Sequence, residues 1–199
     1  MTESRLSEMQ RDGIAEVGNV GAGQVATYLS EVTCEKVDLS VPEVDVVPSE
    51  HAKESLELYE GSNSATVSVY STAENIEGAV ILSFMKEDYS KLLNLVEKGE
   101  NDEDLLQVGN KTVEVYLDAL EKFLGLKVET SDAELAFLPL KGLFDTVISK
   151  IEDGGVDESS DVLIVQTMLE VGEDIEGEVT MVIEVEDTEE LLEAIDERV

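Results

Sequence analysis

Two pairs of polar residues, each spaced three positions apart, are the residues of this sequence whose types and spacing best suit chemistry. They are Glu16 with Asn19, and Gln107 with Asn110. On a helix, residues three apart occupy adjoining positions of one turn. A carboxylate accepts charge-assisted hydrogen bonds, whereas an amide both accepts and donates them. Each pair therefore offers hydrogen bonding and charge rather than a nucleophile. The alternative, an ordinary solvated helix face, stays open at this point.

Each pair falls within a long segment of helical periodicity, at about residues 7–33 and 102–124. With about 100° of rotation per residue, one side of each helix is apolar and is expected to be buried. These stripes are Ile14, Val17, Gly21, Val25, Tyr28, Leu29 and Val32 in the first helix, and Leu105, Val108, Thr112, Tyr116, Leu120 and Phe123 in the second. The opposite sides hold Asp12, Glu16, Asn19 and Gly23, and Glu103, Gln107, Asn110 and Glu114. Both polar pairs are therefore expected to be exposed.

The first helix also holds four glycines, Gly13, Gly18, Gly21 and Gly23. Each costs about 0.5–1 kcal/mol relative to alanine in a helix. Close packing beneath the helix explains Gly18 and Gly21. Gly23 lies on the exposed side, where a partner lying on top of the helix explains it better.

The sequence contains an internal duplication. Residues 12–48 align with 103–139 at an offset of 91, and residues 75–80 align with 174–179 at an offset of 99. The eight extra residues are placed in a surface loop at Asp153–Ser160, which is polar and rich in glycine. We therefore expect one domain over residues 1–199, with repeat halves at approximately 5–98 and 102–197.

The residue pattern of each copy predicts the same series of helices and strands. A long helix leads to an extended segment that ends at Pro48 or Pro139, then to a short helix, two β-rich runs and a closing helix. The β-rich runs are Ala65–Ser71, Ala79–Met85, Val162–Leu169 and Glu178–Val185. Asn75–Gly78 and Asp174–Gly177 are expected to form the hairpin turns, and Asp187 to cap the last helix. The fold class is an α+β domain with pseudo-two-fold symmetry.

Net charge excludes several partners. The chain of 199 residues has 47 acidic and 13 basic residues, a net charge of −34. Such a chain is repelled by nucleic acid and by anionic membranes. Disorder is excluded because 42% of the residues are apolar and periodic. The acidity predicts a protein from a halophile, in which salt screens the self-repulsion. The alternatives are an ordinary acidic surface and a mimic of nucleic acid.

The cysteine and histidine counts restrict the chemistry further. One cysteine, Cys34, allows no intrachain disulfide, and one histidine, His51, allows no histidine-based zinc site. Cys34 is expected to be a small buried residue near the end of the first helix. The sequence lacks a signal region at its start and an apolar stretch long enough to span a bilayer. These features predict a soluble, cytoplasmic protein.

The spacing Asp12-x3-Glu16-x2-Asn19-x22-Pro42 resembles the signature of the CheC/CheX/FliY phosphatases of bacterial and archaeal chemotaxis. The stretch Gly18–Ser30, GNVGAGQVATYLS, looks like the first active-site helix of CheC. This resemblance implies a pseudo-symmetric α/β domain, in which two long helices lie together on a continuous, mostly antiparallel sheet.

The resemblance also implies an activity, hydrolysis of the aspartyl phosphate of the response regulator CheY. Asn19, and Asn110 in the second copy, would position the attacking water, while Glu16, or Gln107, would dock on the receiver's lysine. An acyl phosphate has a good leaving group, so positioning and charge stabilisation suffice. No cofactor of the chain's own is expected, because the receiver holds Mg²⁺.

The second copy departs from this signature. Gln107 replaces the glutamate, Ala133 replaces the proline, and Lys111 and Glu114 replace Val20 and Gly23. We therefore expect a weakened or inactive second site, although a working Gln-x-x-Asn site remains the alternative. A rival to the enzyme is a non-catalytic adaptor that senses CheY-phosphate and regulates the receptor deamidase CheD, which CheC also binds.

Overall fold

The computed structural model describes residues 6–48, 64–73, 76–96, 102–138 and 161–184. Its helices are α1 (Glu8–Thr33), α3 (Lys86–Leu95) and α4 (Asp102–Leu124). Helices α1 and α4 agree closely with the two long helices that periodicity predicts. The short helices expected after Pro48 and Pro139, the loop at 153–160 and the last helix at Asp187 lie outside the described residues. None of the described helices is long and apolar enough to cross a membrane.

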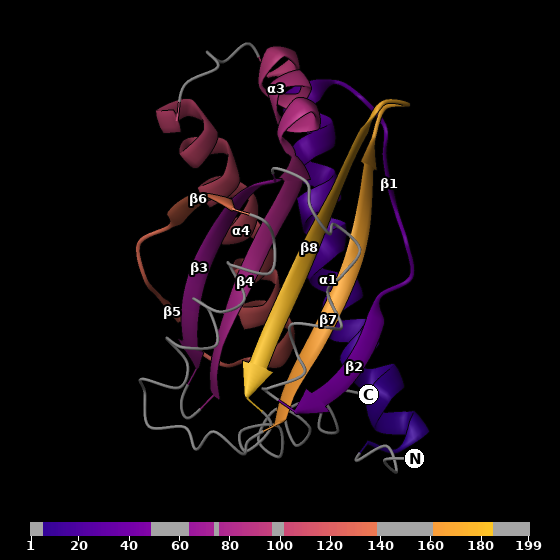
Figure 1. Cartoon of the computed structure of the whole chain (residues 1–199). Coiled ribbons are helices and arrows are strands. Elements are labelled where there is room, and N and C mark those ends of the chain that lie inside the picture. The colour runs from indigo at the N-terminus through magenta and orange to yellow at the C-terminus, as the bar shows by residue number, and fades with distance from the viewer. Residues whose placement is uncertain (1–5, 49–63, 74–75, 97–101, 139–160, 185–199) are drawn as a thin grey trace.

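Within the described residues, eight strands form one continuous sheet (Figure 1). They are β1 (Val37–Leu39), β2 (Glu43–Pro48), β3 (Ser64–Ala73), β4 (Ile76–Met85), β5 (Glu129–Thr130), β6 (Glu134–Leu138), β7 (Asp161–Val171) and β8 (Ile175–Glu184). The strand order is β1-β7-β8-β4-β3-β5, with β2 also paired to β7 and β6 to β3. Every one of these pairings is antiparallel. The predicted α+β fold with a continuous antiparallel sheet is therefore confirmed.

The two copies are interleaved in the sheet. Strand β2 of the first copy pairs with β7 of the second, so that Val44 lies opposite Val165. In the same way, β6 of the second copy pairs with β3 of the first. At the centre, β4 pairs with β8 around Ile81 and Thr180, which are equivalent at the offset of 99. Each copy thus completes its sheet edge with strands from the other.

The positions expected for the hairpin turns are wrong by a few residues. Strand β8 already begins at Ile175, so the second turn is formed by Gly172–Asp174, and Gly172 has a positive φ of 67°. Gly177 lies within the strand opposite Phe84, and a Cβ on it would lie 2.3 Å from the Phe84 ring. This glycine serves a close approach between strands rather than a turn.

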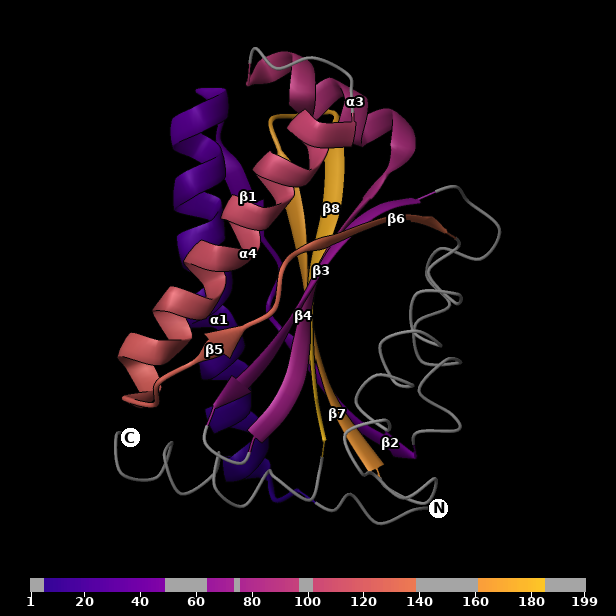
Figure 2. The same cartoon turned by 90° about the vertical axis from the view of Figure 1, so that its left-hand side faces the viewer.

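Helices α1 and α4 lie side by side on one face of the sheet and run in opposite directions (Figure 2). Their glycines permit close packing. A Cβ on Gly18 would lie 2.7 Å from Val165 of β7, and a Cβ on Gly21 would lie 2.6 Å from the Tyr116 ring of α4. At these distances any larger residue would force the neighbouring side chains to shift. The packing explanation for Gly18 and Gly21 is therefore confirmed.

Both ends of α1 are capped. Ser7 and Gln10 form a reciprocal capping box at its start, an arrangement worth about 1 kcal/mol. At its end, Cys34 adopts the left-handed conformation with φ of 59°. The expectation of a buried Cys34 is wrong, because this residue is exposed. The aligned residue, Gly125, ends α4 with φ of 71°, so the position is a helix C-cap in both copies.

Candidate functional site

Helix α1 presents Glu16 and Asn19 to solvent on a rigid support. Both residues are exposed, whereas their neighbours Ile14 and Val17 are 0% exposed and pack into the core. The face that periodicity predicted to be buried therefore anchors the helix. This leaves the carboxylate and the amide on adjoining positions of one exposed turn.

Pro42 lies against this turn of α1. A Cβ on Gly18 would lie 3.5 Å from Pro42 Cβ, so the loop before β2 packs beside the residue that precedes Asn19. Arg11 ties the adjoining strand β2 to the helix, since its guanidinium donates to the Val44 carbonyl oxygen and lies 3.8 Å from the Asp45 carboxylate. Sequence reasoning missed Arg11. The sequence does offer a signal for this contact, because Arg11 is a cation directly before Asp12 in a chain with only 13 basic residues.

Helix α4 presents Gln107 and Asn110 in a similar way, with different surroundings. Both residues are exposed. One turn further on, Lys111 Nζ and Glu114 Oε2 form an ion pair at 2.6 Å. The hydrogen bond from Lys111 to Glu114 raises the pKa of this lysine. The charge of Glu114 is therefore balanced within the chain, although both long side chains still stand on this face.

The corresponding face of α1 is bare. The residues equivalent to Lys111 and Glu114 are Val20 and Gly23. A Cβ placed on Gly23 would meet nothing within 4 Å, so packing within the described structure does not demand this glycine. The small side chains at these two positions leave room for close approach from outside.

The two pairs cannot act on one small group. A Cβ on Gly21 would lie 2.6 Å from the Tyr116 ring, so in this antiparallel helix pair Asn110 lies opposite the part of α1 near Tyr28. The charges of Lys111 and Glu114 also act on the pKa of Tyr28, which burial raises overall. Tyr28 is nine residues beyond Asn19, about 14 Å along a helix axis. Asn110, next to Lys111, is therefore more than two turns away from Asn19. The structure places each pair at its own end of the helix layer.

A groove runs between the helices beside Asn19. It has a volume of about 410 Å³ and is lined in part by Val20 and Gln24 of α1 and by Val115, Asp118 and Lys122 of α4. The groove is open to solvent and carries charges of both signs. It extends the exposed surface around the first pair across to the second helix.

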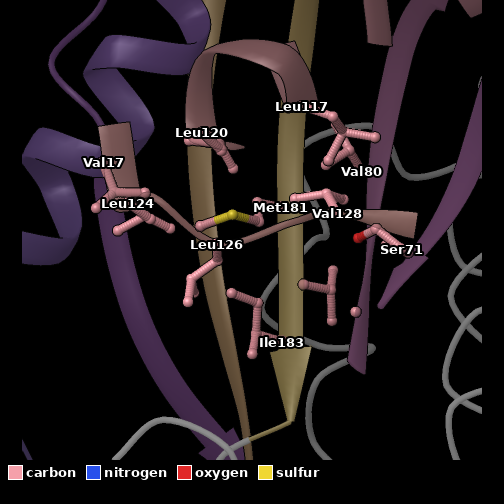
Figure 3. A pocket seen from close by; sticks show the side chains of 13 residues that line it. Val17, Ser71, Val80, Leu117, Leu120, Leu124, Leu126, Val128, Met181 and Ile183 are labelled. Carbon is pink, nitrogen blue, oxygen red and sulfur yellow. The ribbon is translucent and has the colours of Figure 1, made fainter. Parts of the chain in front are cut away.

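The apolar cavity shown in Figure 3 lies elsewhere. It has a volume of about 40 Å³ and is lined by residues of α1, α4, the segment after α4 and the sheet, which include Val17, Leu120 and Met181. A small-molecule site usually needs about 300 Å³ or more. None of the four candidate site residues lines it. The described part of the chain also holds no group of three or more His, Cys, Asp or Glu residues that could bind a metal ion.

Comparison with known proteins identifies a curated relative of part of the chain. No protein-family model matches the chain. The flagellar motor switch phosphatase FliY of Bacillus subtilis is 51% identical over 43 residues, which is 22% of this chain and 11% of that protein. The match therefore covers only a small part of the relative's length.

Solved structures resemble the chain over most of its length. FliY of Thermotoga maritima has a TM-score of 0.70 at 21% identity, covering 98% of this chain and 100% of that one. FliM in the FliG–FliM complex of H. pylori has a TM-score of 0.64 at 12% identity, with coverages of 94% and 100%. CheX of Desulfovibrio desulfuricans has a TM-score of 0.55 at 11% identity, with coverages of 84% and 99%. The chain therefore has the fold of these FliY, FliM and CheX structures, and the resemblance to the CheC/CheX/FliY proteins that the sequence indicated is confirmed.

Proposed function

We propose that the chain is a phosphatase that hydrolyses the aspartyl phosphate of a CheY-like receiver domain. The observation that carries this proposal is the exposed Glu16–Asn19 turn on a helix whose other face is buried. A short match to a protein named as a phosphatase supports it. Hydrolysis would release inorganic phosphate and restore the aspartate carboxylate.

Asn19 is assigned the role of positioning water. Its amide oxygen can accept a hydrogen bond from the attacking water, while its NH₂ group can donate to a phosphoryl oxygen. In phosphoryl transfer, alignment and charge stabilisation make up most of the catalysis. The buried stripe of α1 fixes the backbone from which this amide projects, so little ordering is needed when the receiver binds.

Glu16 is assigned the role of docking. A carboxylate one turn before Asn19 can accept a charge-assisted hydrogen bond from the receiver's lysine, and so set the orientation of the two proteins. The Mg²⁺ that supports the chemistry would be held by the receiver. Gln107 on α4 can accept a hydrogen bond but offers no charge, so the second pair is assigned at most a weak activity.

The test is phosphate release from excess phosphorylated CheY-like receiver, measured in high salt with catalytic amounts of the chain. Asn19→Ala should lower kcat by about 10²–10³-fold, the usual cost of removing one stabilising donor, and leave the unfolding midpoint unchanged. Asn94→Ala, which removes an exposed amide on α3, is the matched control and should retain activity. If neither Asn19→Ala nor its combination with Asn110→Ala lowers the rate, the phosphatase proposal is wrong.

The second candidate is a non-catalytic adaptor that senses CheY-phosphate and binds CheD. The ion pair of Lys111 and Glu114 favours it, because α4 then presents a face unlike that of α1. A solved structure of FliM, which has the same fold, is a complex with FliG. Turnover separates the two candidates, since an adaptor would bind the phosphorylated receiver without clearing an excess of it.

A further inference from the structure

A β-bulge separates β1 from β2 beside the candidate site. Strand β1 ends with Leu39 opposite Leu169, and β2 begins with Glu43 opposite Gln166. The three residues 40–42 therefore face only two residues of β7. Ser40 fixes the bulge, because its N–H donates to the Met168 carbonyl oxygen at 3.1 Å and its Oγ accepts from the Met168 N–H at 3.0 Å. Bulges often redirect a side chain next to an active site.

The residue at the apex of this bulge is an exposed valine. Val41 is 82% exposed, the highest value among the large apolar residues that the structure describes. Its neighbour Pro42 packs against α1 at Gly18. The bulge therefore stands beside the turn that carries Glu16 and Asn19.

The second copy forms the same bulge with a different apex. Residues 131–133 face two residues of β3, between the pairs Thr130–Ser71 and Glu134–Ser68. Ser40 Oγ donates to the Val41 carbonyl oxygen, and Ser131 Oγ donates to the Asp132 carbonyl oxygen in the same way. Asp132, exposed, thus occupies the position of Val41. Because the bulge forms with aspartate at its apex, its backbone does not require an apolar residue there.

We propose that Val41 is a docking residue, which contacts an apolar side chain of the receiver while Glu16 binds the receiver's lysine. This proposal rests on the proposed phosphatase function. The surroundings are acidic, with Asp12, Glu16 and Glu43 exposed. They fit a partner whose apolar patch is bordered by cations. An apolar contact also excludes water from the neighbouring charge pair and strengthens it. The bulge of the second copy has Asp132 at this position and so offers no apolar side chain for such a contact.

The experiment compares Val41→Asp with Asn19→Ala on purified phosphorylated receiver. Asp132 shows that the bulge accepts aspartate, so the unfolding midpoint should change little. Val41→Asp should raise KM about tenfold, as for a moderate interface residue, with kcat within about twofold. Asn19→Ala should instead lower kcat at similar KM. Leu95→Asp, which adds the same charge at a partly exposed apolar residue of α3, should leave both constants unchanged.

Two results would overturn the docking role. An unchanged KM for Val41→Asp is one, and an equal rise in KM for Leu95→Asp is the other, because net charge would then be the cause. The dissociation constant of each variant for the receiver is measured as well. If neither Asn19→Ala nor its combination with Asn110→Ala lowers turnover, the phosphatase proposal fails, while the dissociation constant of Val41→Asp still decides whether Val41 contacts the receiver.

Discussion

Helices α1 and α4 pack on the sheet in the same way, but their exposed faces carry different side chains. Both follow a buried stripe, carry an asparagine at the same aligned position and rest on a strand valine through a glycine, Gly18 or Gly109. They differ beyond that asparagine, where α1 has Val20 and Gly23 while α4 has the Lys111–Glu114 ion pair. The comparison shows that the duplicated fold keeps the buried contacts of each copy, while the exposed side chains differ.

The largest expected effect is the conversion of one face into the other. In an Asn19→Ala background, the triple change Gln107→Glu, Lys111→Val and Glu114→Gly should restore phosphatase activity at the second site. A restored charge-assisted contact is worth about 1.5–3 kcal/mol, or roughly 10–100-fold in rate or affinity. Phosphate release measures it, and adding Asp132→Val should raise it further.

Failure of the rebuilt second site to regain activity would have a specific meaning in this experiment. If the rebuilt variant is folded and still binds the receiver without turnover, the second face is shaped for another partner, for which CheD is the leading candidate. The Asn19→Ala chain with native α4 is the control, since it sets the residual activity.

The shared glycines should be sensitive in both copies. A Cβ on Gly109 would lie 2.3 Å from Val67, and one on Gly18 would lie 2.7 Å from Val165. Overpacking of this kind costs about 1–3 kcal/mol. Gly109→Ala and Gly18→Ala should therefore both lower the free energy of unfolding in denaturant titrations, Gly109→Ala more. Equal stability of both variants and the parent would contradict the close packing of helix on sheet.

The whole chain is acidic, including both helix faces, so its stability should depend on the salt concentration. Raising KCl from about 0.1 M to 1 M shortens the screening length from about 10 Å to about 3 Å. The net charge of −34 then repels itself less, so the midpoint of thermal unfolding should rise steadily. An uncharged osmolyte at equal osmolality is the control. A flat salt profile would remove the argument for a halophile.

Gly23 should separate stability from activity. Gly23→Ala places a methyl group where nothing lies within 4 Å, and alanine favours a helix over glycine by about 0.5–1 kcal/mol. This variant should unfold at a slightly higher temperature and yet have a higher KM for the phosphorylated receiver. A more stable variant with unchanged KM would mean that no partner approaches α1 at this position.

The smallest expected effect concerns the C-caps of the two helices. Cys34 has a φ of 59° and the aligned Gly125 a φ of 71°. The left-handed conformation costs an L-residue about 1–2 kcal/mol. Glycine avoids this cost, but it also raises the conformational entropy of the unfolded chain, which offsets part of the stabilisation. Cys34→Gly should stabilise the chain by about 0.5–1 kcal/mol, and Gly125→Ala should destabilise it, both by chemical denaturation. Equal shifts in one direction would contradict the shared cap.

The sequence determined much of this protein through local periodicity. The 3.6-residue period located both long helices and separated the buried Ile14 and Val17 from the exposed Glu16 and Asn19. The duplication predicted that the second half repeats the first. Cys34 aligns with Gly125, and a glycine at this position is typical of a helix C-cap. The residue type of Cys34 alone pointed instead to a buried residue, whereas Cys34 is an exposed C-cap.

Only the tertiary structure decided which strands pair and what surrounds the site. Local periodicity does not show that β2 pairs with β7 or that β6 pairs with β3, since these partners are far apart in the chain. The same holds for Gly177, read from the sequence as a turn residue but placed in a strand against the Phe84 ring. The position of Pro42 against Gly18, next to Asn19, depends on this long-range pairing. Strand register is set by packing between distant segments, and so the surroundings of the site emerge only when the whole sheet is assembled.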